Sequence, residues 1–169
     1  MNRYLRNGWH GLLAGMALLA ALLQPAAAAD VGSRITWPDV QLIDGRVLQA
    51  ADLNRRTVIV EFWGSDCPFC ARQNPHLEKL HRALQGTRAM VLTFSIDPQA
   101  ATAGEYVARH GYSFPVALAP AKGATLFGVR KGLPELYVVE PGGRIAEKQV
   151  GEMFPEDVQA LARYAEESK

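Results

Sequence analysis

The sequence contains little cysteine: Cys67 and Cys70 are the only two among its 169 residues. Two cysteines exclude a disulfide-rich scaffold, and they supply only half of the ligands that a structural zinc site normally needs. The chain also lacks an excess of charge of either sign, because its formal net charge is +1 at pH 7. Nucleic acid and anionic membranes are therefore not expected as main partners. No internal repeat or low-complexity run follows the first 29 residues, so one globular domain is expected.

Acidic residues are absent from the first 29 residues, which carry Arg3 and Arg6 and then an uncharged run rich in leucine and alanine at 11–23. This run is shorter than the roughly 20 residues of a membrane-spanning helix, and small residues at 26–29 suit a signal peptidase. We therefore predict a signal peptide at 1–29, cleaved near its last residue, and a mature domain at 30–169. An uncleaved membrane anchor is the alternative. Either reading places the domain in the periplasm or another extracytoplasmic compartment.

The two cysteines are separated by only two residues, Pro68 and Phe69. A disulfide across so small a loop adds little to stability, because the entropy lost by the unfolded chain grows with loop length. Such a pair in an exported protein is better explained by thiol–disulfide exchange than by structural bracing.

The pattern of apolar and turn residues predicts alternating strands and helices along the domain. A hairpin is expected at 40–48 around Asp44-Gly45, and a helical turn at 50–54. The further expected strands and apolar segments are 57–63, 89–96, 114–118, 135–139 and 144–150, and the expected helices are 67–85, 100–110, 121–127 and 155–167. This order predicts an α/β fold with a central mixed sheet flanked by helices and an added N-terminal β-hairpin.

The cysteine pair opens the helix that follows the strand at 57–63. The unpaired N–H groups and positive partial charge of a helix N-terminus favour the thiolate of Cys67, which is our candidate nucleophile. Cys70 lies one turn further into the helix, so its sulfur can attack Cys67 and release a bound substrate. Cys70 is therefore the candidate resolving thiol.

The segment VEFWGSDCPFC, with Glu61, Trp63 and the two cysteines at these spacings, resembles the thioredoxin superfamily. Two further features agree: Pro75 falls eight residues after Cys67, and Leu133-Pro134 precedes a predicted strand. The hairpin, the signal peptide and the segment VVEPGGRI at 138–145 are most similar to the TlpA/ResA/DsbE-like group of extracytoplasmic thiol–disulfide oxidoreductases.

The resemblance implies roles for several residues. Pro134 would be cis and face the cysteines, and the backbone of Leu133 would pair with an extended substrate segment. Glu61 would take the proton from Cys70 during resolution, because burial raises the pKa of a carboxyl group. Trp63, Pro68 and Phe69 would line the substrate-binding surface, and a core position is the alternative for Trp63. No metal and no cofactor other than the redox-active disulfide is implied.

The same resemblance implies exported proteins with disulfides or thiols as substrates, a membrane electron donor and a monomeric state.

The sequence departs from the reductase group at Asp66, where an aromatic residue is usual, and at Phe69, where a second proline is usual. A negative charge at Asp66 opposes ionisation of Cys67. A thiol oxidase or isomerase of the same fold and a copper-binding carrier therefore stay open as alternatives. A peroxiredoxin-type peroxidase is disfavoured because Gly64, not threonine, precedes Cys67 by three residues.

Overall fold

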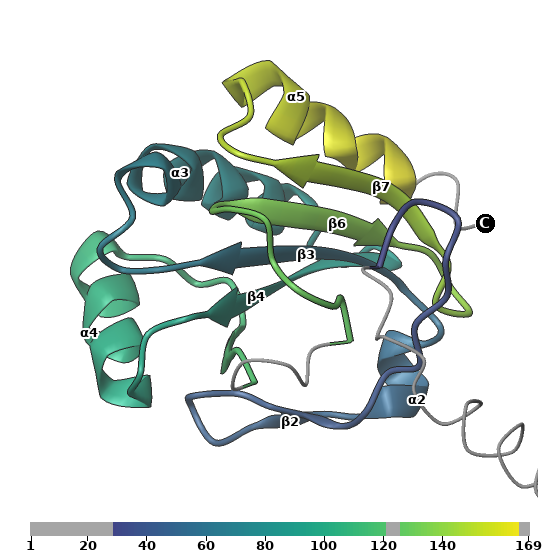
Figure 1. The fold of residues 1–169 in the computed structure, drawn as a ribbon, viewed down its shortest axis with the longest axis horizontal. Helices are drawn as coiled ribbons and strands as arrows, with labels where there is room; N and C mark the ends of the chain where they lie inside the picture. Colours follow the sequence, from purple (N-terminus) through teal and green to yellow (C-terminus); the bar gives the residue numbers. More distant parts are fainter. Residues whose placement is uncertain (1–28, 121–125, 166–169) are drawn as a thin grey trace, which may run out of the picture.

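A five-stranded mixed sheet forms the centre of the protein in a computed structural model that describes residues 29–120 and 126–165 (Figure 1). The strand order is β5-β4-β3-β6-β7. The strands are β3 (Thr57–Trp63), β4 (Ala89–Ser95), β5 (Val116–Leu118), β6 (Glu135–Val139) and β7 (Ile145–Val150). β4 runs parallel to β3 and β5, whereas β6 is antiparallel to β3 and β7. The predicted mixed sheet is confirmed.

The central strand β3 is buried along its whole length, as expected for an apolar run that lies between two strands and is covered on both faces. Side chains alternate between the two faces. Ile59 and Trp63 lie in the core cluster that also takes in residues of α3 (Pro68–Ala83), α4 (Ala100–His110) and α5 (Pro155–Ala160). Val58, Val60 and Phe62 face the opposite way. The strand therefore brings its carboxyl end, and the cysteines after it, to a site between two packed layers.

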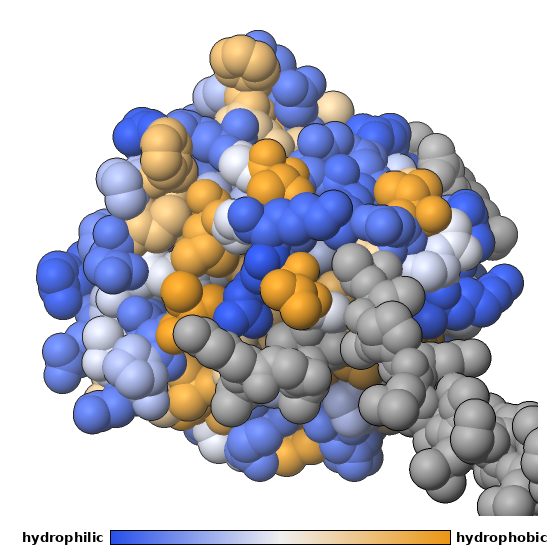
Figure 2. All heavy atoms as spheres, in the orientation of Figure 1, coloured by the Kyte–Doolittle hydropathy of each residue, from blue (hydrophilic) through white to orange (hydrophobic). Residues whose placement is uncertain are grey.

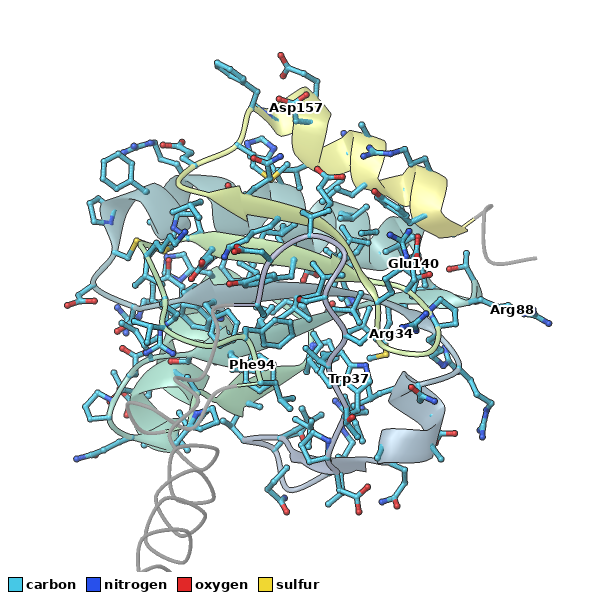
Figure 3. All side chains as sticks on the ribbon, turned by 45° about the vertical axis from the view of Figure 1, so that its right-hand side comes forward. Arg34, Trp37, Arg88, Phe94, Glu140 and Asp157 are labelled. Carbon is cyan, nitrogen blue, oxygen red and sulfur yellow. A yellow bond between two sulfur atoms is a disulfide. The ribbon has the colours of Figure 1, made fainter. Side chains whose placement is uncertain are left out.

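The second face of the sheet is covered mainly by the N-terminal part of the described chain. Trp37 and Phe94 point into this layer (Figure 3) and belong to one apolar cluster with Phe62 and Phe127. The hairpin strands β1 (Val40–Gln41) and β2 (Val47–Leu48) pair as predicted, and the short helix α2 (Ala50–Leu53) follows them. A bridge between Leu42 and Ala117 and a hydrogen bond from Ile43 N–H to the Val116 carbonyl join the hairpin to β5.

Two predicted elements differ from the structure at their ends. The strand expected within 114–118 begins only at Val116, because Pro115 has no N–H to donate to a neighbouring strand. The helix predicted for 155–167 is α-helical only to Ala160 and continues as a 3₁₀-helix over Leu161–Ala165, a tightening that is common at helix C-termini.

Other predictions fall on residues that the structure does not describe. The signal peptide predicted for 1–29 lies outside the described residues except for Ala29. Of the helix expected at 121–127, only Leu126 and Phe127 are described, and both lie in a turn. None of the helices within 29–120 and 126–165 combines the length and the apolar character needed to cross a membrane.

Candidate active site

Cys67 and Cys70 form a disulfide at the start of α3, directly after the loop that leaves β3 (Figure 3). Their Cα atoms lie 5.3 Å apart. Cys67 is partly exposed, whereas Cys70 is 0% exposed and packs in the core. A substrate can therefore reach the sulfur of Cys67 but not that of Cys70, which agrees with the roles assigned from the sequence.

The helix start places a backbone donor at the sulfur of Cys67. Cys67 is the N-cap of α3, and its sulfur accepts a hydrogen bond of 3.2 Å from the backbone N–H of Cys70. Pro68 occupies the first helical position, where its missing N–H leaves no intrahelical bond unmade. An N–H donor and the positive end of the helix dipole both stabilise a thiolate at this position. The exposed carboxylate of Asp66 next to it acts in the opposite direction.

The loop that delivers Cys67 is held by Asp97, a residue that the sequence analysis did not single out. The Asp97 carboxylate accepts from Ser65 Oγ at 2.7 Å and from the Ser95 hydroxyl at 2.6 Å. These bonds tie the loop after β3 to the end of β4.

The predicted cis bond is present between Leu133 and Pro134. Pro134 is buried, and Leu133 is partly buried against the same apolar cluster that contains Cys67 and Cys70. The Pro134 carbonyl accepts a 2.8 Å hydrogen bond from the N–H of Gly151, which follows β7. The structure therefore brings the proline loop and the cysteine pair together although they lie far apart in the sequence.

Glu61 is 0% exposed and is held by two amide side chains of α3. Gln73 Nε2 donates to Glu61 Oε2 at 2.6 Å. In the orientation that satisfies its neighbours, the Asn74 amide donates to Glu61 Oε1 at 3.1 Å and to the Cys70 carbonyl at 3.2 Å. Burial raises the pKa of Glu61 to about 7, and the bond from Gln73 partly opposes this rise. The carboxyl group therefore titrates near neutral pH beside the residue that carries the inner sulfur.

Trp63 lies deeper than the substrate-binding role expected of it would require. It is 0% exposed, and its ring packs 5.1 Å from that of Tyr106. In this structure it has no surface to offer a substrate, because β3 is covered on both faces up to its last residue. Trp63 supports the site from within the core.

Exposed and partly buried apolar side chains near the first turns of α3 and the cis-proline loop form what we call the apolar rim: Phe69, Leu133, Val150 and Phe154. Phe69 and Phe154 are 51% and 71% exposed. The guanidinium of Arg72 lies 4.8 Å from the Phe69 ring centre and pairs with Glu152. Val150 lies beside Gly132, next to Leu133. Apolar side chains project over the starts of α3 and α5 on the face shown in Figure 2.

Sequence analysis found Phe69 and Leu133 but missed Val150 and Phe154. Val150 ends β7 and Phe154 lies in the β7–α5 connection, which reaches the first turns of α3 only in the folded chain, through Glu152 to Arg72 and Met153 to Gln73.

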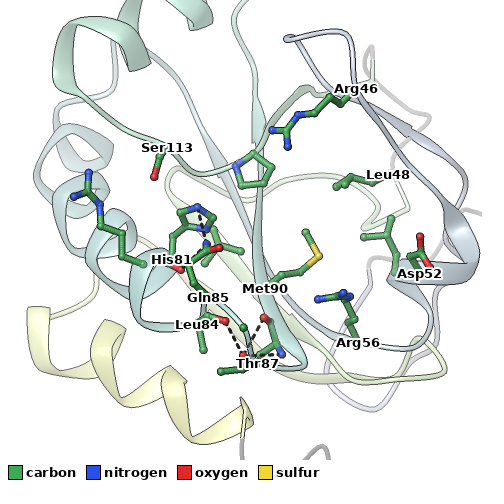
Figure 4. Close-up of a pocket in the computed structure, with 16 residues that line it drawn as sticks. Arg46, Leu48, Asp52, Arg56, His81, Leu84, Gln85, Thr87, Met90 and Ser113 are labelled. Atoms are coloured by element: carbon green, nitrogen blue, oxygen red, sulfur yellow. Dashed lines mark hydrogen bonds between the residues drawn. The ribbon is translucent and has the colours of Figure 1, made fainter.

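A pocket of about 630 Å³ lies away from this site (Figure 4). It is lined by the end of α3, the start of β4 and the hairpin region, with Arg46, His81 and Met90 among its residues. None of the predicted site residues lines it.

Comparisons with known proteins agree with this geometry. Residues 31–148 match the model of the AhpC/TSA family. The thiol–disulfide oxidoreductase ResA of Halalkalibacterium halodurans is 28% identical over 120 residues, which are 69% of this chain and 66% of that protein. ResA of Geobacillus thermodenitrificans is 26% identical over 85% of this chain and 83% of its own length. A thiol:disulfide interchange protein of the thioredoxin family from Chlorobium tepidum TLS shares the fold, with a TM-score of 0.67 and 20% identity over 82% of this chain and 99% of its own.

Proposed function

The chain belongs to the AhpC/TSA family, and on that premise we propose that it is a thiol–disulfide oxidoreductase that reduces disulfides of proteins outside the cytoplasm. The observation that carries the proposal is the disulfide between a partly exposed Cys67 at a helix N-terminus and a buried Cys70. An accessible sulfur with a protected partner is what stepwise thiol–disulfide exchange requires.

The reduced enzyme would act in two displacements. The Cys67 thiolate attacks one sulfur of the substrate disulfide, forms a mixed disulfide and releases the other substrate sulfur as a thiolate. Cys70 then gives its proton to the Glu61 carboxylate, and its thiolate attacks Cys67 Sγ. This second step forms the Cys67–Cys70 disulfide and releases the remaining substrate sulfur. Two electrons have passed to the substrate, and an electron donor in the membrane would restore the dithiol.

The substrate would be a segment of polypeptide that lies across the apolar rim. The backbone beside the cis peptide bond at Leu133 can pair with an extended segment, and the rim can take apolar side chains that flank its cysteine. Exported proteins such as apocytochromes or proteins with a copper site fit this requirement, since their cysteines must be reduced before cofactor binding. The proposal includes export of the domain by its leader and activity as a monomer.

The proposal is tested by the reduction potential of the cysteine pair, measured by titration against glutathione, together with reduction of insulin by the purified protein. We expect catalysed insulin reduction and a potential well below that of a strong oxidant. A potential of about −120 mV would instead identify an oxidase. A full-length fusion to a reporter that is active only outside the cytoplasm tests the location.

The apolar rim yields a prediction for substrate binding. Phe154→Ala is expected to raise KM for a protein disulfide about tenfold and to leave the rate with a small disulfide such as oxidised glutathione unchanged. The reason is that a mostly exposed phenylalanine loses apolar contact area only where a polypeptide covers it.

The matched control is Val47→Ala, which removes another exposed apolar side chain, 44% exposed, from the hairpin strand β2. Val47→Ala should change neither the KM for the protein disulfide nor the rate with oxidised glutathione. Equal effects of Phe154→Ala on both substrates would show that the rim acts through the chemistry of the cysteines and not through protein binding.

A further inference from the structure

The side chain of Gln73 joins the buried carboxyl group to the substrate-facing loop. It is 1% exposed, and both ends of its amide are engaged. Its nitrogen donates to Glu61 Oε2 at 2.6 Å, and its oxygen accepts from the backbone N–H of Met153 at 2.7 Å. A backbone N–H can only donate, so the Met153 bond fixes which end of the amide faces Glu61. Gln73 must therefore present a donor to the carboxyl group.

The loop that orients Gln73 is itself attached to the rest of the site. Gly151 N–H donates to the Pro134 carbonyl at 2.8 Å, and the Glu152 carboxylate binds Arg72. Phe154, at the end of the same loop, belongs to the apolar rim. One short segment, 151–154, thus contacts the cis-proline loop, the first turns of α3 and, through Gln73, the Glu61 carboxylate.

We propose that Gln73 is a positioning residue that sets the proton affinity of Glu61, with its donor held in place by the Met153 N–H. A donor at 2.6 Å stabilises the ionised carboxylate more than the neutral acid, and burial makes this preference stronger. Without Gln73, Glu61 would hold its proton to higher pH, so a smaller fraction of it would be ionised at neutral pH and able to accept the proton of Cys70. Only this consequence for the proton of Cys70 rests on the proposed function.

The described neighbours of Glu61 offer few other groups that could change its pKa. From α3 it meets Gln73 and Asn74, and its register partners are Thr93 on β4 and Leu136 on β6. None of these four side chains carries a charge, and Cys70, whose carbonyl shares the Asn74 amide with Glu61, is held in the disulfide of the oxidised protein. Burial and the Gln73 bond are accordingly the causes of the shifted pKa of Glu61.

The test is a ¹³C NMR titration of the Glu61 carboxyl carbon in the oxidised full-length protein, with the signal assigned from Glu61→Gln. Gln73→Met removes both hydrogen bonds at nearly constant volume, and Gln73→Glu keeps an acceptor for Met153 N–H but replaces the donor to Glu61. Both variants are expected to raise the apparent pKa by about one pH unit or more, Gln73→Glu by the larger amount because two carboxyl groups would share one proton.

The matched control is Gln159→Met, because Gln159 Nε2 also links α5 to α3, through a 2.8 Å bond to the His76 carbonyl, without touching Glu61. An unchanged Glu61 titration in both Gln73 variants overturns the inference, and so does an equal shift in Gln159→Met. The rate at which Cys70 resolves a mixed disulfide should shift to higher pH in parallel. If the wild type does not catalyse exchange, the proposed function fails while the NMR titration still decides the role of Gln73.

Discussion

Cys67→Ser is expected to lower disulfide reduction by on the order of a thousandfold or more, because a serine hydroxyl is hardly ionised at neutral pH and cannot replace a thiolate nucleophile. Cys70→Ala is expected to stop turnover after the first displacement, at the mixed disulfide on Cys67. Cys67 remains partly exposed at the start of α3 and still attacks the substrate, but no inner thiol resolves the mixed disulfide. The two single substitutions therefore separate the attacking sulfur from the resolving one.

The measurement is capture of proteins on Cys67 in cells that express Cys70→Ala, followed by non-reducing electrophoresis and mass spectrometry. Captured partners should disappear on reduction and in the Cys67→Ser/Cys70→Ala double variant, which is the matched control. They should also be exported proteins with paired cysteines. Capture by Cys67→Ser with its intact Cys70 would contradict the assignment, because Cys70 is 0% exposed.

The cysteine site was predictable because its signal is local. Two cysteines at this spacing, a buried strand before them and a helix after them occupy one continuous segment, and the structure places all of them as predicted. Gln73 and Asn74 were missed although a signal exists. They lie three and four residues after Cys70, so they share its face of the helix, and a polar pair on a buried helix face requires a polar partner.

The covering of the second face of the sheet was harder to predict. Trp37, Phe62 and Phe127 come from three distant segments and meet only in the folded chain. Local periodicity gives the hairpin at 40–48 but not the layer against which it packs. The same reason explains why Phe154 was missed, because its loop meets the first turns of α3 only in the folded chain.

Glu61→Gln is expected to slow resolution of the mixed disulfide about a hundredfold at pH 8 and to remove its pH dependence. In the wild type the rate should rise with pH through about 7, because the carboxyl group accepts a proton only when it is ionised. An amide at this position cannot accept that proton. Stopped-flow kinetics with a fluorescent mixed disulfide on Cys67 measures the step directly. A pH profile that keeps its rise near 7 in the variant would assign the proton transfer to another group.

The same substitution should remove part of the loss of folding stability that occurs as pH rises, an effect that depends on the titration of Glu61 and not on its role in exchange. The pKa of Glu61 is raised from 4.5 to about 7 by burial, so between these values the folded state holds a proton that the unfolded state has released. Folding stability of the wild type then falls as pH rises, by about 1.4 kcal/mol per pH unit from this group. Glutamine does not titrate, so the difference in unfolding free energy between Glu61→Gln and wild type should move by about 3 kcal/mol in favour of the variant between pH 4.5 and 8. Urea unfolding of both oxidised proteins at these two pH values measures this change, and an equal pH dependence in the two would show that Glu61 is not the buried acid that the geometry indicates.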